Sequence, residues 1–185
     1  MKLSKITAAV AAIVLGAASA ASMAAGSSAK GEIRFTGEIN ESPCTITSDT
    51  QFQTLAMDSI SSSVLKNGGK SALKKFVIKL QGCDNSALKA VTATFTGAES
   101  SNDGLLKLGG VEGASLAIAD DGGSLIKLGA ASSVFNLSAG DNNLRFSAYL
   151  QGDTALGGES GTEVIAADIV GGTFDATAGF TLAYQ

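Results

Sequence analysis

The chain has 185 residues, a formal net charge of −4, 45% hydrophobic residues and only 16% charged residues. This length allows one ordinary domain, and the mildly acidic balance excludes the basic surface that binding to nucleic acid requires. The chain contains no histidine, so it lacks the most common general base and the most common metal ligand. With 23 glycines, one proline and no tryptophan, the composition predicts many short strands joined by glycine-rich turns.

Residues 1–24 have the three-part pattern of a secretory signal peptide. Two lysines precede an apolar run over residues 6–18, and small residues follow that run. We expect cleavage before Ala25, with a second candidate site after residues 18–20. A membrane-spanning helix is the alternative, but the apolar run is shorter than the ~20 residues that a bilayer requires. The segment therefore predicts export.

After residues 25–30, which are small and polar, the chain alternates between apolar and polar side chains. Gly31, Ile33, Phe35, Gly37 and Ile39 share one parity. In an extended chain these residues lie on one face, so we expect an amphipathic strand. The proline at position 43 interrupts this strand, because proline cannot donate to a strand ladder, and a short strand resumes at 45–47.

The middle of the chain predicts a series of short strands. We expect one over 52–57, a turn at 67–69, and further strands over 76–80, 91–95, 105–108, 116–119, 125–128, 134–137, 144–150 and 164–170. Glycine-rich turns separate these pieces, and no helix longer than one or two turns is needed. The spacing predicts a single all-β domain folded as a β-sandwich.

The last fourteen residues, 172–185, form the clearest pattern in the chain. One parity carries Phe174, Ala176, Ala178, Phe180, Leu182 and Tyr184, and the other is mostly polar. This pattern predicts that the chain ends on a strand with one buried face, which is unusual because terminal residues normally fray. The simplest interpretation is an ordinary edge strand of a complete sandwich.

Cys44 and Cys83 are the two cysteines of the chain. An even pair in an exported protein predicts one disulfide. The two residues are far apart in sequence and no histidine can complete a site, so a catalytic or metal-binding pair is a poor alternative.

Several short motifs match enzyme signatures without the residues that would make them work. Four Ser-x-x-Lys matches begin at Ser63, Ser71, Ser86 and Ser124, and none has the accompanying motifs of penicillin-recognising enzymes. The serine within 158–161 has no histidine for a triad, the glycines of 109–113 have no strand-helix unit around them, and Asp120-Asp121 lacks the spacing of a calcium loop. We predict no catalytic residue, no metal site and no cofactor, although catalysis by carboxylates alone remains open.

The mature chain resembles the pilin subunits of chaperone-usher fimbriae, the class of type 1 and P pili. The residues that carry this resemblance are the run Gly31–Ile39, the cysteine segments Ser42–Ile46 and Leu80–Cys83, the penultimate-strand motif Asn143–Tyr149, and Gly172 and Tyr184 in the fourteenth and second positions from the C-terminus. Together they span nearly all of residues 31–185.

The resemblance implies an incomplete immunoglobulin-like β-sandwich that a donor strand from another protein completes. Residues 25–36 would be the N-terminal donor extension, with Ala29, Gly31, Ile33 and Phe35 as its inserted side chains, and residues 37–185 would be the domain. The acceptor groove, which also binds the chaperone, would be lined by Gly172, Phe174, Ala176, Ala178, Phe180, Leu182 and Tyr184.

The resemblance also implies the partners and the location of the protein. A periplasmic chaperone would lend a strand, an outer-membrane usher would exchange it for the extension of the next subunit, and a head-to-tail homopolymer would form a fimbria at the cell surface. The protein would be a structural subunit that supports adhesion, not an enzyme. The alternatives are a minor or adaptor pilin, or a monomeric secreted lectin-like sandwich that binds a receptor.

Overall fold

The computed structural model describes residues 30–37, 39, 42–157 and 163–185, in two units over residues 1–39 and 40–185. The predicted signal peptide, Ala29 and the motif at 158–161 lie outside the described residues. In the first unit, residues 30–37 and 39 form no helix or strand, and Ile33 and Phe35 are 78% and 87% exposed. The amphipathic strand predicted here is not formed, because a strand needs a hydrogen-bonded neighbour to be stable.

The second unit contains two packed sheets, of which the larger has six strands. They are β1 (Thr45–Ile46), β2 (Lys74–Cys83), β4 (Leu106–Lys107), β5 (Ala114–Asp120), β6 (Leu125–Ile126) and β8 (Gly140–Gly152). Their order is β1-β2-β8-β5-β4, and β6 pairs with β5. All the pairs are antiparallel, and Phe76 of β2 lies opposite Phe146 of β8.

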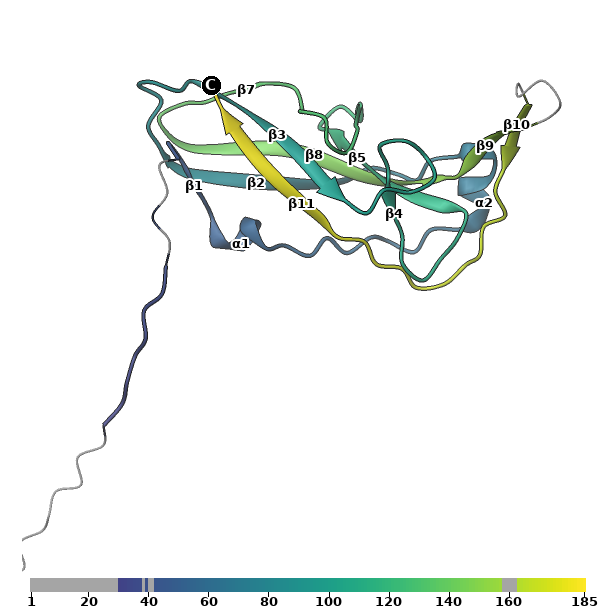
Figure 1. Ribbon diagram of the computed structural model, residues 1–185, viewed down its shortest axis with the longest axis horizontal. Coiled ribbons are helices and arrows are strands. Elements are labelled where there is room, and N and C mark those ends of the chain that lie inside the picture. Colours follow the sequence, from purple (N-terminus) through teal and green to yellow (C-terminus); the bar gives the residue numbers. More distant parts are fainter. Residues whose placement is uncertain (1–29, 38, 40–41, 158–162) are drawn as a thin grey trace, which may run out of the picture. The chain divides into compact units, whose positions relative to one another are not determined.

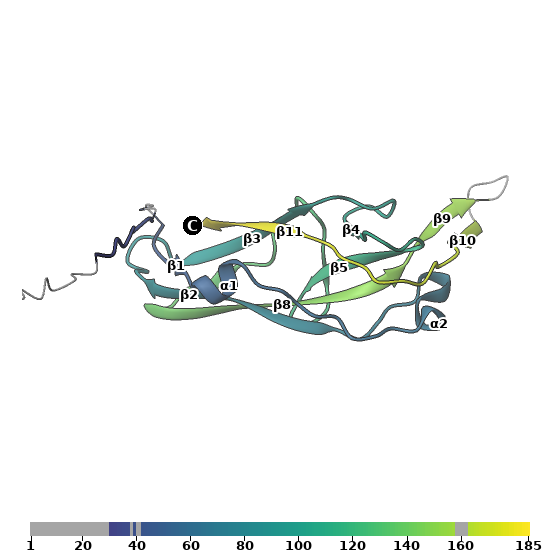
Figure 2. The same ribbon diagram turned by 90° about the horizontal axis from the view of Figure 1, so that it is seen from below.

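The smaller sheet has the order β11-β3-β7, with β11 at Ala178–Tyr184, β3 at Ala90–Gly97 and β7 at Phe135–Asn136. It lies over the larger sheet, and the two layers are clear when the domain is seen from below (Figures 1 and 2). Aromatic side chains from both sheets meet between the layers: Phe95 contacts Phe146 edge-on at 5.1 Å between ring centroids, and Phe135 contacts it at 5.3 Å. This packing confirms the predicted β-sandwich.

The remaining elements are small. They are the hairpin of β9 (Thr154–Gly157) and β10 (Glu163–Ala166), two four-residue helices, α1 (Ser48–Gln51) and α2 (Ser62–Leu65), and the 3₁₀ turn η1 (Lys66–Gly68). Within the described ranges, none of the helices is long and apolar enough to cross a membrane. The turn predicted at 67–69 is confirmed, with Asn67 and Gly68 at φ 55° and 76°.

The strand predicted over residues 52–57 is wrong. The segment follows α1 without regular structure and is held to β2 by side chains instead of by a backbone ladder. The amide Nε2 of Gln53 donates to the carbonyl oxygen of Val77 at 3.2 Å, and Lys74 Nζ lies 3.1 Å from Asp58 Oδ1. Two side-chain bonds, from Gln53 and from Asp58, thus link this part of the chain to β2, and no strand forms over residues 52–57.

Candidate functional site

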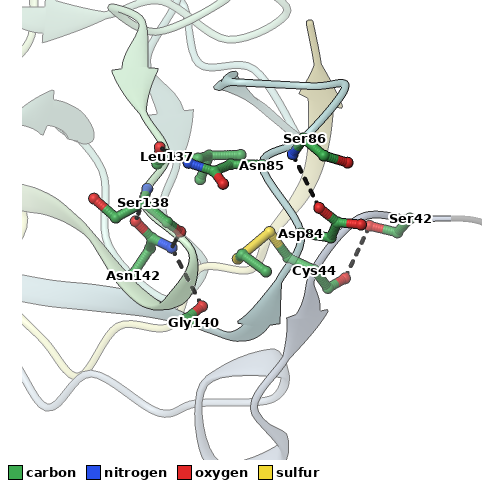
Figure 3. Close-up of a disulfide and its surroundings, with 10 residues drawn as sticks. Ser42, Cys44, Asp84, Asn85, Ser86, Leu137, Ser138, Gly140 and Asn142 are labelled. Carbon is green, nitrogen blue, oxygen red and sulfur yellow. Dashed lines mark hydrogen bonds between the residues drawn. A yellow bond between two sulfur atoms is a disulfide. The ribbon is translucent and has the colours of Figure 1, made fainter.

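The disulfide between Cys44 and Cys83 fixes the beginning of the domain to the end of β2 (Figure 3). Both cysteines are buried, and their Cα atoms lie 4.2 Å apart. The backbone N–H of Asp84 donates to the carbonyl oxygen of Pro43 at 2.9 Å. The two segments of the chain that the disulfide joins are therefore also linked by a backbone hydrogen bond beside it. The backbone N–H of Ser86 donates to the Asp84 carboxylate and lowers the pKa of that group. The predicted disulfide is confirmed.

Strand β11 has a partner on one side only. It pairs with β3 along its whole length, from Ala178 opposite Gly97 to Tyr184 opposite Val91. It is the end strand of its sheet, and no other strand of the described chain pairs with it. The C-terminal strand of the chain therefore has an open outer edge.

The hydrogen bonds at the end of β11 show which backbone groups face that edge. Gln185 and Ala90 exchange two N–H to carbonyl bonds, both of 2.9 Å. In an antiparallel pair such residues alternate with residues whose N–H and C=O point away from the partner. Phe180, Leu182 and Tyr184 are therefore the residues of β11 that direct their backbone groups toward the open edge.

The same three residues carry the apolar face of the strand. Their side chains are half-buried and pack on the main core, where the ring of Phe180 lies 6.5 Å from that of Phe95. The intervening Thr181 and Ala183 are exposed on the opposite face. We call this the acceptor edge: the outer side of β11 with the backbone groups and half-covered side chains of Phe180, Leu182 and Tyr184.

The regular strand begins at Ala178 and not at Gly172, which corrects the predicted extent of the terminal strand. Residues 172–177 run beside the turn that connects β4 and β5, where Asp175 exchanges two backbone hydrogen bonds of 2.8 and 3.2 Å with Gly109. Strand β3 ends at Gly97, so it offers these residues no ladder. The alternation of burial nevertheless continues through this segment.

The predicted acceptor residues therefore fall into two groups. Phe174 and Ala176 are half-buried against a second apolar cluster, which contains Leu65, Leu108, Ala114 and Leu150. Phe180, Leu182 and Tyr184 pack on the main core. Gly172 lies close to Gly110, where a Cβ atom would be 3.1 Å from the carbonyl oxygen, and Ala178 is exposed.

Sequence reasoning missed the residues that support the acceptor edge from below. Phe76, Phe95 and Ile46 belong to the core on which β11 packs. The alternation of the strands around positions 76 and 95 was visible, but nothing in the sequence indicated which terminal residues those strands would face. The backbone N–H of Lys89, which donates to the carbonyl oxygen of Gln185 at 2.9 Å, had no sequence signal either.

The described part of the first unit contains three of the four predicted donor residues. Gly31, Ile33 and Phe35 are all exposed. A Cβ atom at Gly31 would meet no atom within 4 Å. Among the residues that the structure describes, no group of three His, Cys, Asp or Glu side chains could hold a metal ion.

Comparison with known proteins identifies the family. The family model described as fimbrial protein matches residues 33–185. The chain belongs to the fimbrial protein family. Similar curated proteins include the Fimbria A protein of Serratia marcescens, 46% identical with all of both chains covered, and the Major MR/P fimbria protein of Proteus mirabilis, 40% identical with the same coverage.

Solved structures agree with this assignment. The P pilus rod subunit PapA superposes with a TM-score of 0.64 at 25% identity, covering 78% of this chain and all of that one. A subunit from a chaperone-usher pilus structure, solved to explain rod uncoiling, superposes with a TM-score of 0.69 at 26% identity, covering 85% of this chain and 96% of the other. This pilin is thus a structural subunit of cell-surface fimbriae with an incomplete immunoglobulin-like sandwich. It is not an enzyme, and other pilin subunits are its partners.

Proposed function

We propose that this pilin polymerises by donor-strand exchange, in which the acceptor edge of one subunit binds residues 25–36 of the next. One observation carries the proposal: Phe180, Leu182 and Tyr184 present half-covered apolar side chains, and backbone groups with no partner in the described chain, on the same open edge. An extended segment that adds to such an edge supplies the missing hydrogen bonds and covers the side chains.

The N-terminal segment has the sequence that this edge requires. Ile33 and Phe35 are exposed and share one parity, so a strand formed by the segment would place both toward the core. Full burial of each side chain would contribute about 1.5–3 kcal/mol. Gly31 would fit where the core leaves no room for a side chain, and Ala29 would be the leading residue, which enters the groove first.

A subunit with an open edge needs protection before assembly, since unpaired strand edges promote aggregation. We infer that the signal peptide directs export to the periplasm, where a chaperone lends a strand to the acceptor edge. Basic chaperone residues would hold the C-terminal carboxylate of Gln185. At the outer-membrane usher, the N-terminal segment of the next subunit would replace the chaperone strand. The similarity to a subunit of a chaperone-usher pilus supports this route.

Donor and acceptor are different surfaces of one chain, so the contact is head-to-tail and generates an open filament. The similarity to a major fimbrial protein and to a rod subunit favours the major rod subunit over a minor or adaptor pilin. A monomeric lectin-like sandwich is disfavoured, because an open edge with half-covered aromatic side chains would promote its aggregation.

The proposal is tested by deleting the donor segment in cells that make fimbriae. A variant that lacks residues 25–36 should still accumulate with its chaperone but should not enter surface fimbriae, as seen by electron microscopy of sheared material. Ile33→Asp should behave like the deletion, because a carboxylate cannot be buried in the core.

The matched control is Glu32→Ala, which changes the neighbouring residue of the opposite parity and should leave assembly intact. Normal fimbriae built from the deleted chain would refute donor-strand exchange through this segment. Equal defects in Ile33→Asp and Glu32→Ala would refute the predicted register.

A further inference from the structure

Over the described residues, the larger sheet has a second unpaired edge, along the first part of β8, where β5 no longer pairs with it. Strand β5 pairs with β8 only from Phe146 to Gly152, while β2 pairs with β8 from Ala148 back to Gly140. Residues 141–145 of β8 therefore have a strand on one side only within the described chain. A hollow of about 390 Å³ opens here, lined by the turn Asp120–Gly122, Ser133, Phe135, Asn143 and Arg145. Its volume lies within the range of small-molecule sites.

The hollow is lined by two carboxylates that already accept hydrogen bonds, and by the side chains of Arg145 and Asn143. Asp120 Oδ1 accepts from the backbone N–H of Ser124 at 2.8 Å, and Asp121 Oδ1 accepts from Lys75 Nζ at 2.9 Å. Each carboxylate is thus oriented by a neighbour and keeps an oxygen that can accept further bonds. Among the described residues, the side chains of Arg145 and Asn143 have no hydrogen-bond or ion-pair partner, although both line the hollow.

The apolar part of the hollow is an aromatic ring. Phe135 is half-buried, and its position is fixed by the edge-on contact with Phe146 at 5.3 Å. A fixed, half-covered ring offers a surface for the C–H face of a cyclic ligand. The guanidinium of Arg145 matches a carboxylate in planar, two-point geometry, and the free carboxylate oxygens match hydroxyl donors.

The ligand that matches these groups has a ring with C–H groups, several hydroxyls and one carboxylate, which are the features of an acidic sugar. We propose that this hollow, the Arg145 hollow, binds an acidic saccharide, with Arg145 on the sugar carboxylate, Phe135 under the ring, and Asn143 and the carboxylates of Asp120 and Asp121 on the hydroxyls. The hollow is formed by the turn 120–122, β7 and β8, and contains no residue of β11, so the site is separate from the acceptor edge.

Polymerisation would repeat this site many times in one assembly, which raises the overall strength of binding. A small, open site with few polar contacts is expected to bind a single sugar weakly, with a dissociation constant on the order of millimolar. A fimbria repeats the same site along its length, and linked sites bind a polyvalent ligand far more tightly than one site alone. The rod would thereby hold polyanionic glycans along its whole surface.

Saturation-transfer NMR on purified fimbriae tests the proposal, because the large assembly transfers magnetisation efficiently to a bound small molecule. The probes are glucuronic acid and N-acetylneuraminic acid, with glucose and acetate as partial ligands. We expect ring-proton signals from the acidic sugars, and signals at least about fivefold weaker from glucose and from acetate.

Arg145→Gln should weaken the signal of the acidic sugars at least fivefold, and Asn143→Ala should weaken it in the same direction. Lys107→Gln is the matched control, since it removes one exposed positive charge from β4, outside the hollow. Equal signals from glucose and glucuronic acid would overturn the proposal. So would equal losses in Arg145→Gln and Lys107→Gln, or binding of acetate alone, which would indicate non-specific attraction of anions. Should Arg145→Gln fail to assemble, the Asn143→Ala variant decides, because an unchanged signal there contradicts the site.

Discussion

Two glycines with similar backbone conformations separate the effect of backbone strain from the effect of close packing. Gly110 and Gly129 have φ of +83° and +75°. A Cβ at Gly110 would lie 2.4 Å from the carbonyl oxygen of Thr173, whereas a Cβ at Gly129 would meet nothing within 4 Å. Gly110 therefore lets the residues before β11 approach the β4–β5 turn.

We expect Gly129→Ala to cost about 1 kcal/mol of unfolding free energy, from the left-handed conformation alone. Gly110→Ala should cost at least about 1 kcal/mol more, because a backbone carbonyl must move to make room. Urea unfolding of the subunit with a donor strand bound measures both losses. Equal losses would show that residues 172–175 relax freely away from the turn.

Asp49 links stability to acid pH. Lys79 Nζ donates to Asp49 Oδ2 at 2.8 Å, and this bond lowers the pKa of Asp49, with the Thr47 side chain contributing in the same direction. A carboxyl with a lowered pKa stabilises the fold above its unfolded pKa, near 4, and that contribution disappears as the pH falls through the folded pKa.

Asp49→Asn should therefore be less stable than the parent at pH 6 and equal to it near pH 2. The measurement is the urea midpoint as a function of pH. Lys79→Met removes the same bond from the other side and should reduce the acid dependence in the same way. A difference between parent and Asp49→Asn that stays constant down to pH 2 would contradict the assigned cause.

At the level of the element, the two faces of the β11 backbone should exchange hydrogen at different rates. The amides of Thr181 and Ala183 point toward β3, and those of Phe180 and Leu182 point toward the open edge. In a subunit without a donor strand, the second pair should exchange much faster than the first. Binding of a peptide with the sequence of residues 25–37 should slow the second pair and leave the first nearly unchanged.

Amide exchange followed by NMR makes this comparison residue by residue. Uniform protection of all four amides before the peptide is added would mean that the acceptor edge is already covered. Uniform exposure would mean that β11 is not paired with β3 in the free subunit. The alternation itself is the expected signature of a strand with one missing neighbour.

Strands with a buried face were predictable because their alternation is long enough to read. Strands β2, β3 and β8 contain Ile78, Ala93 and Phe146 at buried positions of a period-two pattern, and these strands are where the sequence placed them. The disulfide followed from export and an even cysteine count. The strands were inferred from local sequence and the disulfide from the oxidising compartment that export implies, so neither inference required knowledge of which segments pair in the fold.

The errors occur where the partner decides the structure. Ile33 and Phe35 have a strand pattern, but no strand forms over the described residues 30–37 and 39. Residues 172–177 keep their alternation and yet pair with the β4–β5 turn, since β3 has already ended. Residues 52–57 form no strand; the Gln53 side chain bonds to β2, and Met57 packs on the second apolar cluster. Alternation shows which side chains share a face, and it does not show which backbone will bind them.

On the scale of the whole molecule, the described chain contains both a strand, β11, with a neighbour on one side only and a segment, residues 30–37 and 39, that has a strand pattern but forms no strand. Both features leave apolar surface uncovered: the side chains of Phe180, Leu182 and Tyr184 are half-covered, and those of Ile33 and Phe35 are exposed. A closed dimer that exchanged both segments would satisfy two copies only. In the proposed head-to-tail assembly, successive contacts would satisfy every copy except those at the ends of the filament, so the filament could keep growing.

The contact between subunits should resist detergent at room temperature. Fimbriae sheared from cells and run in detergent without heating should give a ladder of multimers, and heating should collapse the ladder to one band, because release of the donor requires the sandwich to open. Leu182→Asp should abolish the ladder by placing a carboxylate on the core face of the acceptor edge. Thr181→Asp, one residue away on the exposed face of the same strand, should keep it. A ladder of normal length from Leu182→Asp would show that the subunits are joined through a surface other than β11.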